Sequence, residues 1–279
     1  MKRLSLIFAI MAAMIFAVSC GSKKETKKTL VLYYSQTSNT KLVAEEFAKK
    51  LDADIEEIVA VNPYDGDFAQ TIERCLKERE EGVIPEIQPI KSDVSKYEVI
   101  FLGYPIWFGT YAPPVTKFLQ EVDLSGKKIV PFCTFGSGGL ESSLRDLEKA
   151  QPNAMIMNGY GVRAARMDAM PAEVDQFLKE NGFIPGEYTQ LDDFSDLHEV
   201  TEEEASIFVK ATGDYPMMHA KPEMAASRAI PGGTEYLYDA VDIPRENRDD
   251  MPPASRMKVY VVLLKDQAPV FTRVVRQNK

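Results

Sequence analysis

Residues 29–41 read TLVLYYSQTSNTK, and this stretch decides how the rest of the chain is interpreted. Residues 30–34 form an apolar run typical of a buried β-strand, residues 35–40 are polar, and a helical spacing of apolar residues follows. A helix that begins after such a turn favours an anion, because its first N–H groups lack partners and its dipole is positive there. An ordinary strand-to-helix connection capped by Thr40 explains the same pattern, and this stretch alone does not separate the two interpretations.

The composition is that of a globular protein, and its charge argues against some classes of binding partner. The chain has 279 residues and a formal charge of −9, which suits one large domain or two modest ones. Without residues 1–19 the charge becomes −11, because Lys2 and Arg3 are removed. This acidity argues against nucleic acid and against electrostatic attraction to a membrane surface. Residues 35–40 contain no Lys and no GxxxxGK[ST] pattern, which excludes a nucleotide-triphosphate P-loop.

Residues 1–20 are predicted to be a targeting segment outside the fold. Two basic residues open it, an apolar run covers residues 4–18, and it ends at Cys20. The arrangement resembles a bacterial lipoprotein signal, in which the cysteine becomes the lipidated first residue. The resemblance implies attachment to the bacterial cell envelope, on the periplasmic side, with residues 21–28 as a solvated tether. An ordinary cleaved signal peptide and an anchor helix are the alternatives.

Residues 29–185 alternate strands with helices, which predicts a doubly wound parallel sheet. The five expected strands are residues 30–34, 54–59, 97–103, 128–134 and 154–157. Ligands of such sheets lie beyond the carboxyl ends of the strands. Three irregular segments are expected there, at residues 35–40, 104–111 and 134–139. They offer an anion site, a group of aromatic rings and a glycine-rich backbone, which together suit a phosphate joined to a flat heterocycle.

The motifs YYSQTSNT (33–40), GYPIWFGTYAPP (103–114) and PFCTFGSGG (131–139) resemble those of the flavodoxin family. The resemblance implies a flavodoxin-like fold and FMN as the cofactor. It assigns the FMN phosphate to Ser35, Gln36, Thr37, Ser38, Asn39 and Thr40. It assigns the borders of the isoalloxazine ring to Pro105, Ile106, Trp107, Phe108, Thr134, Phe135, Gly136, Ser137 and Gly138.

Two residues depart from the family pattern. Ser38 stands where the phosphate loop usually has Gly, so a positive φ at this position would cost energy. Phe135 replaces a small residue, and we expect it to crowd the pyrimidine edge of a flavin.

Residues 186–279 have no such alternation, and they are predicted to form a smaller α+β domain. A helix is expected at residues 201–212, followed by three or four antiparallel strands that include residues 234–241, 257–264 and 270–275. The pattern around residues 229–236 resembles cystatin-like domains. Arg228 replaces the Gln of their inhibitory loop, so an interaction or packing module is predicted rather than a protease inhibitor.

Other chemistry-bearing residues do not form a recognisable catalytic or metal pattern. Neither His198 nor His219 has a Cys or second His at metal spacing, so no metal site is predicted. No Ser/His/Asp or Cys/His signature is present. Cys75 and Cys133 fall in apolar patterns and are expected to be free thiols.

The favoured function is that of a membrane-anchored, FMN-binding electron-transfer protein. Its partner would be a redox protein or a small-molecule acceptor, and no catalytic residue is predicted because electron transfer needs no acid or base. One alternative is an NAD(P)H-dependent flavin or quinone reductase. A second is a binding module without flavin, which the departures at Ser38 and Phe135 favour.

Overall fold

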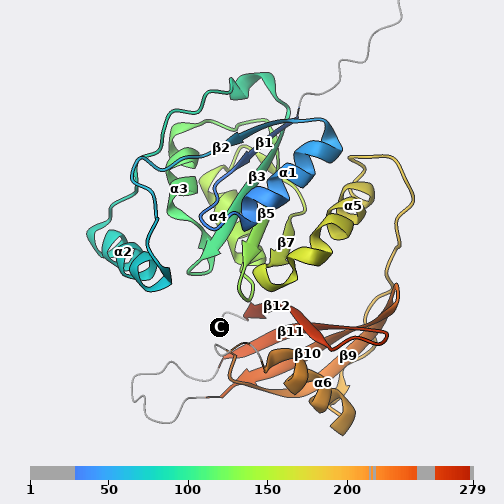
Figure 1. Cartoon of the computed structure of the whole chain (residues 1–279). Helices are drawn as coiled ribbons and strands as arrows, with labels where there is room; N and C mark the ends of the chain where they lie inside the picture. The colour runs from blue at the N-terminus through green and yellow to red at the C-terminus, as the bar shows by residue number, and fades with distance from the viewer. Residues whose placement is uncertain (1–28, 214, 216–217, 244–254, 277–279) are drawn as a thin grey trace, which may run out of the picture.

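The computed structural model describes residues 29–213, 215, 218–243 and 255–276. The expected signal that ends at Cys20 and the tether at residues 21–28 lie outside these residues. In the part that is described, no helix has the length and apolarity needed to cross a membrane. Figure 1 shows two bodies, a helix-covered parallel sheet and a smaller antiparallel sheet with one helix.

The larger body is built on a parallel sheet with the strand order β2-β1-β3-β5-β6. Its strands are β1 (Thr29–Tyr33), β2 (Asp54–Glu57), β3 (Val99–Trp107), β5 (Lys128–Phe135), β6 (Met155–Ile156) and β7 (Tyr160–Arg163). β7 pairs with β5 beyond β6, in the same parallel direction. This arrangement confirms the predicted five-stranded doubly wound sheet, and it brings the carboxyl ends of β1, β3 and β5 to one edge.

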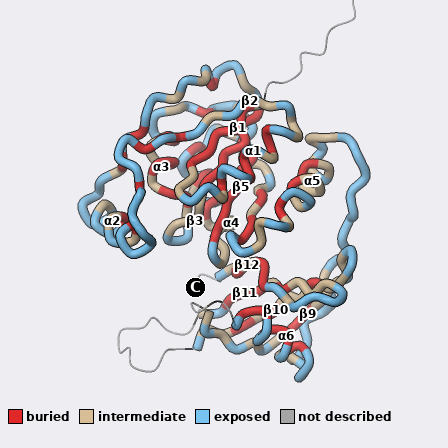
Figure 2. The backbone as a smooth tube through the Cα atoms, viewed as in Figure 1, coloured by how far each residue is buried: buried red, intermediate tan, exposed pale blue. Residues whose placement is uncertain are grey.

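Helices cover both faces of the sheet. α1 (Asn39–Leu51) and α5 (Met170–Glu180) pack on one face, and their apolar residues share a core with Val31 and Phe101. α2 (Phe68–Glu81), α3 (Pro113–Glu121) and α4 (Leu140–Ala150) contribute to the core of the other face. Short 3₁₀ turns lie at Val94–Lys96 and Ala164–Ala169. Figure 2 shows how the central strands are buried between the two helical layers.

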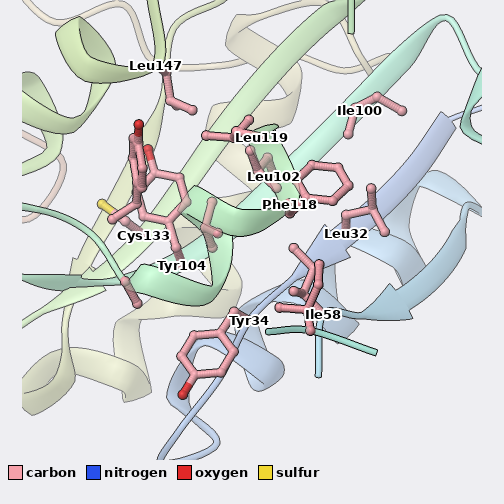
Figure 3. Packing of buried hydrophobic residues seen from close by; sticks show 14 of the residues in the cluster. Leu32, Tyr34, Ile58, Ile100, Leu102, Tyr104, Phe118, Leu119, Cys133 and Leu147 are labelled. Carbon is pink, nitrogen blue, oxygen red and sulfur yellow. The ribbon is translucent and has the colours of Figure 1, made fainter. Parts of the chain in front are cut away.

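Figure 3 shows the packing of the core beneath α3 and α4, which includes Tyr104, Phe118 and Cys133. The Tyr104 hydroxyl lies 3.1 Å from Ser143 Oγ, so its burial leaves no unpaired hydroxyl. Burial raises the pKa of Tyr104 well above its usual value, which keeps the phenol neutral. Cys75 and Cys133 are both buried free thiols.

Two local expectations are corrected. The fifth strand is not one run at residues 154–157 but two pieces, β6 and β7. Gly161 lies in β7, where a Cβ would sit 2.8 Å from the Phe135 ring, so this position requires glycine. Because glycine has low strand propensity, the sequence pattern did not indicate a strand here. The segment at residues 104–111 is not irregular either, because β3 extends through it and turns back into β4 (Thr110–Tyr111).

The smaller body is an antiparallel sheet in the order β12-β11-β10-β9-β8, with α6 packed on it. Its elements are β8 (His198–Glu199), α6 (Glu202–Thr212), β9 (Ala220–Ile230), β10 (Gly233–Asp242), β11 (Arg256–Leu264) and β12 (Val270–Arg276). The predicted helix and antiparallel strands are confirmed. β9 is not among the strands named from the sequence, and Pro222 within it explains its weak pattern.

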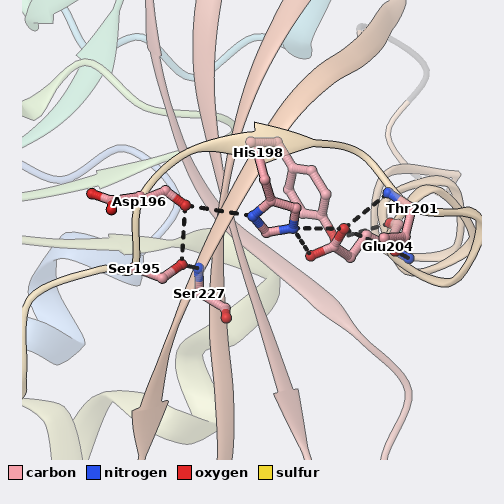
Figure 4. A network of polar contacts seen from close by, with 7 residues as sticks. Ser195, Asp196, His198, Thr201, Glu204 and Ser227 are labelled. Atoms are coloured by element: carbon pink, nitrogen blue, oxygen red, sulfur yellow. Dashed lines mark hydrogen bonds and ion pairs between the residues drawn. The ribbon is translucent and has the colours of Figure 1, made fainter.

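Polar contacts join the segment before α6 to that helix, as Figure 4 shows. His198 Nε2 lies 2.9 Å from a Glu204 carboxylate oxygen, and that carboxylate also accepts from the Thr201 N–H in a capping box. The hydrogen bond to Glu204 raises the pKa of His198. Ser195 Oγ contacts the backbone of Ser227 and Asp196 rather than the imidazole, so the cluster lacks the pairing of a nucleophile with its base.

Gly103 provides the first test, at the centre of the parallel sheet. A Cβ on Gly103 would stand 2.1 Å from Cζ of the fully buried Phe132 ring. Gly103→Ala should therefore lower the free energy of unfolding by about 1–3 kcal/mol through overpacking, measured by urea denaturation.

Phe132→Leu supplies the matched control, because it removes the ring atoms that a new Cβ would meet. In the Phe132→Leu background, Gly103→Ala should cost at least about 1 kcal/mol less than in the wild type. Equal costs in both backgrounds would contradict the assigned contact.

Candidate cofactor site

The hydroxyl loop (residues 35–40) connects β1 to α1 and leaves backbone donors available. The Lys41 N–H reaches Ser35 Oγ at 3.3 Å, and the Leu42 N–H reaches the Ser38 carbonyl at 3.0 Å. Within the described residues, the N–H groups of residues 37–40 have no hydrogen-bond acceptor in the protein. The first turn of α1 contains no acidic side chain. This loop therefore has the donors and the dipole orientation that an anion needs.

Ser38, which stands where the family pattern usually has glycine, adopts a left-handed conformation. Its φ is 68° and its ψ is −9°, and its side chain makes no capping hydrogen bond to the helix. A residue with a Cβ is strained in this region. The loop thus has the backbone conformation that a glycine at position 38 would adopt, and Ser38 is strained in it.

Thr40 and Thr134 join the hydroxyl loop to the end of β5. Their hydroxyl oxygens are 2.8 Å apart, and the two residues are 1% and 4% exposed. The resemblance assigns both to cofactor contacts, but each hydroxyl here hydrogen-bonds to the other. The pair fixes the hydroxyl loop relative to the glycine loop (residues 136–139), which follows β5.

The hairpin turn (Phe108 and Gly109) lies at the end of β3. Both residues have positive φ, of 50° and 84°, as expected of a two-residue hairpin turn. Just before the turn, the only tryptophan of the chain, Trp107, contacts Tyr34 and Tyr64 edge-on, with ring centroids 5.9 and 5.1 Å apart. These contacts fix the orientation of the indole ring. Phe108 is 47% exposed at the tip.

The two tyrosines beside Trp107 remain neutral. Burial raises the pKa of Tyr34, and burial together with the Glu78 carboxylate raises that of Tyr64. The Tyr64 hydroxyl donates to Glu78 at 2.5 Å, and the Arg74 guanidinium lies 3.8 Å from the centroid of the Tyr64 ring. This network holds the aromatic group against α2.

Gln36 connects the hydroxyl loop to α2. Its Nε2 donates to the Tyr64 carbonyl at 3.0 Å and to Thr71 Oγ1 at 2.9 Å. The side chain predicted to contact phosphate is therefore used to hold α2 over the sheet edge.

Phe135 is the last residue of β5 and does not stand free in the glycine loop. It is 5% exposed and belongs to the core beneath α3 and α4, where its ring packs over Gly161. Phe135 also lines the cavity beside the glycine loop, so the expectation that it crowds a flavin edge stays a prediction. The glycine on β7 provides the space that draws the ring inward.

A cavity of about 580 Å³ lies between the hairpin turn, α2 and the glycine loop. This volume is in the range of small-molecule sites. Its lining includes the sequence-predicted residues Gln36, Ile106, Trp107, Phe108, Phe135, Gly136, Ser137 and Gly138. The other predicted residues, namely Ser35, Thr37, Ser38, Asn39, Thr40, Pro105 and Thr134, do not line it.

Several lining residues were not predicted. They are Phe68, Thr71, Ile72 and Cys75 of α2, Gly109, Gly139, Glu141, Ser142, Arg145, and Tyr215, Val274, Val275 and Arg276 of the smaller body. The amphipathic pattern of α2 indicated an inward face but not its place above the sheet edge. No local signal identifies the last four. Across the described residues, no cluster of three or more His, Cys, Asp or Glu side chains is suited to a metal ion.

Ser38 provides the test of the strained loop. Ser38→Gly should raise the free energy of unfolding by about 1 kcal/mol, because glycine adopts positive φ without a Cβ penalty. Ser38→Ala is the control, since it removes the hydroxyl but keeps the Cβ, and it should give no gain. A gain of equal size in both variants, measured by urea denaturation, would show that the strain is not at φ.

Three solved structures resemble part of the chain. A protein of Bacteroides eggerthii described as a flavoprotein is 29% identical, with a TM-score of 0.46, over 53% of this chain and 96% of its own. Another from Bacteroides uniformis is 24% identical, with a TM-score of 0.48, over 53% and 98%. A flavoprotein of Lactobacillus acidophilus in complex with FMN is 25% identical, with a TM-score of 0.45, over 48% and 93%.

A family model described as flavodoxin matches residues 28–176, which is more than half of the chain. The parallel sheet with its strand order and the three segments at its carboxyl edge lie within that match. The chain therefore belongs to the flavodoxin family.

Proposed function

We propose that this protein binds FMN at the carboxyl edge of the parallel sheet and transfers electrons through it. The observation that carries the proposal is a cavity of about 580 Å³ at the carboxyl edge of the sheet, lined by the hairpin turn, the glycine loop and, from the hydroxyl loop, Gln36. Family membership supports the choice of FMN. When bound, the flavin supplies the redox chemistry, and the protein supplies binding, orientation and electrostatics.

The hydroxyl loop has the chemistry of a phosphate site. The N–H groups of residues 37–40 have no acceptor among the described residues, and they lie at the positive end of the α1 dipole. No carboxylate in the first helical turn opposes an anion. Ser35, Thr37 and Asn39 add side-chain donors. These groups would hold the phosphate.

The cavity has the chemistry of a site for a flat ring. Trp107 and Phe108 contribute aromatic surface on one side, and the backbone of residues 136–138 contributes hydrogen-bonding groups on another. The aromatic contacts of Trp107 with Tyr34 and Tyr64 fix its ring before any ligand arrives, which lowers the cost of binding.

The lining residues are compatible with electron transfer. Among the described lining residues, Glu141 is the only carboxylate and no histidine is present. Glu141 lies 3.9 Å from Arg273 and is partly exposed. A flavin that exchanges electrons needs no general acid or base from the protein, so this lining is sufficient for the proposed function.

Titration of the purified protein with FMN tests the proposal directly. The protein should quench FMN fluorescence on binding, and Trp107→Leu should weaken the affinity by about tenfold through lost aromatic contact. Riboflavin is the matched ligand control because it has the ring but not the phosphate, and it should bind more weakly than FMN. An absence of quenching with both ligands would reject FMN binding.

We further propose that a lipid on Cys20 attaches the protein to the bacterial envelope, facing the periplasm. The support is the basic start, the apolar run and the cysteine within residues 1–20. Metabolic labelling with a fatty acid in a bacterial host should mark the wild type and should leave Cys20→Ala unlabelled. Cys75→Ala should keep the label, since Cys75 is buried inside the fold. A labelled Cys20→Ala variant would reject the anchor.

A further inference from the structure

The smaller body contacts the glycine loop through the edge of its sheet. β12 is the outermost strand, and the Val274 N–H donates to the Ser137 carbonyl at 2.6 Å. Gly138 and Val274 form a parallel bridge. Figure 1 shows β12 below the ends of the parallel strands. The contact therefore extends hydrogen bonding of the antiparallel sheet onto a loop of the flavodoxin fold.

The approach at this point is too close for any side chain. A Cβ on Gly138 would lie 2.1 Å from the Val274 carbonyl oxygen. Backbone atoms cannot move aside as the end of a flexible side chain can. Glycine at this position thus permits the docking of β12, in addition to its place in the cavity lining.

Arg163, at the end of β7, connects both partners of this contact. Its Nε donates to the Gly136 carbonyl and its Nη1 to the Phe271 carbonyl, each at 2.8 Å. The guanidinium lies 3.5 Å from the centroid of the Phe271 ring. Burial lowers the pKa of Arg163 to about 10, so the group stays charged near neutral pH. Among the described residues no carboxylate pairs with it, and its charge is stabilised by carbonyls of both bodies.

The same contact places four residues of the smaller body in the cavity wall. We call Tyr215, Val274, Val275 and Arg276 the C-terminal wall. Tyr215 packs against Phe271, with ring centroids 5.3 Å apart, and its hydroxyl is the nearest atom, at 3.4 Å, to a Cβ placed on Gly136. The wall therefore stands beside the backbone that is expected to border the flavin ring.

Resting on the proposed FMN site, we infer that the C-terminal wall is part of that site and that FMN binding and the docking of β12 stabilise each other. The glycine loop is shared, because one of its carbonyls is bound by Val274, another by Arg163, and its remaining backbone groups line the cavity. Any ligand that orders this loop favours docking, and by linkage docking favours that ligand to the same extent. Arg163 is the positioning residue of this coupling.

Hydrogen exchange on the full-length wild-type protein tests the coupling. Saturating FMN should slow amide exchange in both residues 136–139 and residues 270–276. Exchange in β10, which lies inside the smaller sheet, is the internal control and should change less. Unchanged exchange at residues 270–276 in a protein that binds FMN would overturn the coupling while the proposed function stands.

Two variants test the same coupling from opposite sides of the contact. Val274→Pro removes the N–H that donates to the Ser137 carbonyl, and this N–H points away from the ladder with β11, so the ladder keeps its hydrogen bonds. The substitution also replaces a side chain that is 7% exposed in the core of the smaller body. Arg163→Lys keeps a charge but cannot bond both carbonyls in the fork geometry of arginine. Each variant should weaken FMN binding about five- to tenfold, since a hydrogen bond contributes about 1 kcal/mol. Affinities within twofold of the wild type in both would overturn the inference.

A double-mutant cycle separates docking from direct contact with the cofactor. Gly138→Ala adds a Cβ that meets the backbone carbonyl of residue 274. Proline keeps this carbonyl, but the loss of the N–H bond to Ser137 should already release β12 in Val274→Pro, so the effect of Gly138→Ala on FMN affinity should be smaller in that background than in the wild type. Additive effects would mean that Gly138 acts on FMN alone and would count against the coupling. Failure of the wild type itself to bind FMN would reject the proposed function and this inference together.

Discussion

The structure depends on one buried positive charge, the Arg163 guanidinium, whose hydrogen-bond acceptors lie in two different parts of the fold. Arg163 is 8% exposed, and its guanidinium is held by one carbonyl from the glycine loop and one from β12. A buried charge without such partners is costly, so moving either partner away carries a free-energy penalty. The Arg163 guanidinium therefore fixes both the relative position of the two sheets and the course of the glycine loop. The cavity is lined by both the glycine loop and β12, so its shape depends on these two hydrogen bonds of Arg163.

The site itself follows from the geometry of a parallel sheet. Because β1, β3 and β5 run in one direction, the segments that follow them meet at one edge, although the first and the last are about a hundred residues apart in sequence. The protein then fixes these segments to one another by side chains rather than leaving them free. The hydroxyl of Thr40, at the start of α1, forms a hydrogen bond with that of Thr134, near the end of β5. The Gln36 side chain donates a hydrogen bond to Thr71 of α2. A site held in this way is organised before its ligand binds.

Features encoded by local pattern were predictable from the sequence, and features created by distant contacts were not. The strand, turn and helix of residues 29–51 follow from apolar spacing, and the family pattern marked Ser38 as a position where glycine is usual, although it did not give the value of φ there. The capping box at Thr201 is likewise local. In contrast, the strand β7 was hidden by Gly161, whose role becomes visible only when the Phe135 ring is placed over it. The inward turn of Phe135 and the pairing of Thr40 with Thr134 have the same origin. Nothing in residues 270–276 indicates that they border a cavity, because their alternation describes only a strand.

Because the chain is synthesised from its N-terminus, the hydrogen bond between Val274 and Ser137 can form only after the flavodoxin fold has been made. The flavodoxin fold is complete in sequence once α5 has been made, but β12 is translated only after residues 181–269 have been added. At roughly 5–20 residues per second, several seconds of synthesis separate the two, and an exported chain crosses the membrane in the same N-to-C order. During that interval the parallel sheet can fold with an unfinished cavity, in which Arg163 and the Ser137 carbonyl still face water. A cofactor that bound before β12 had docked would meet an open edge of the site.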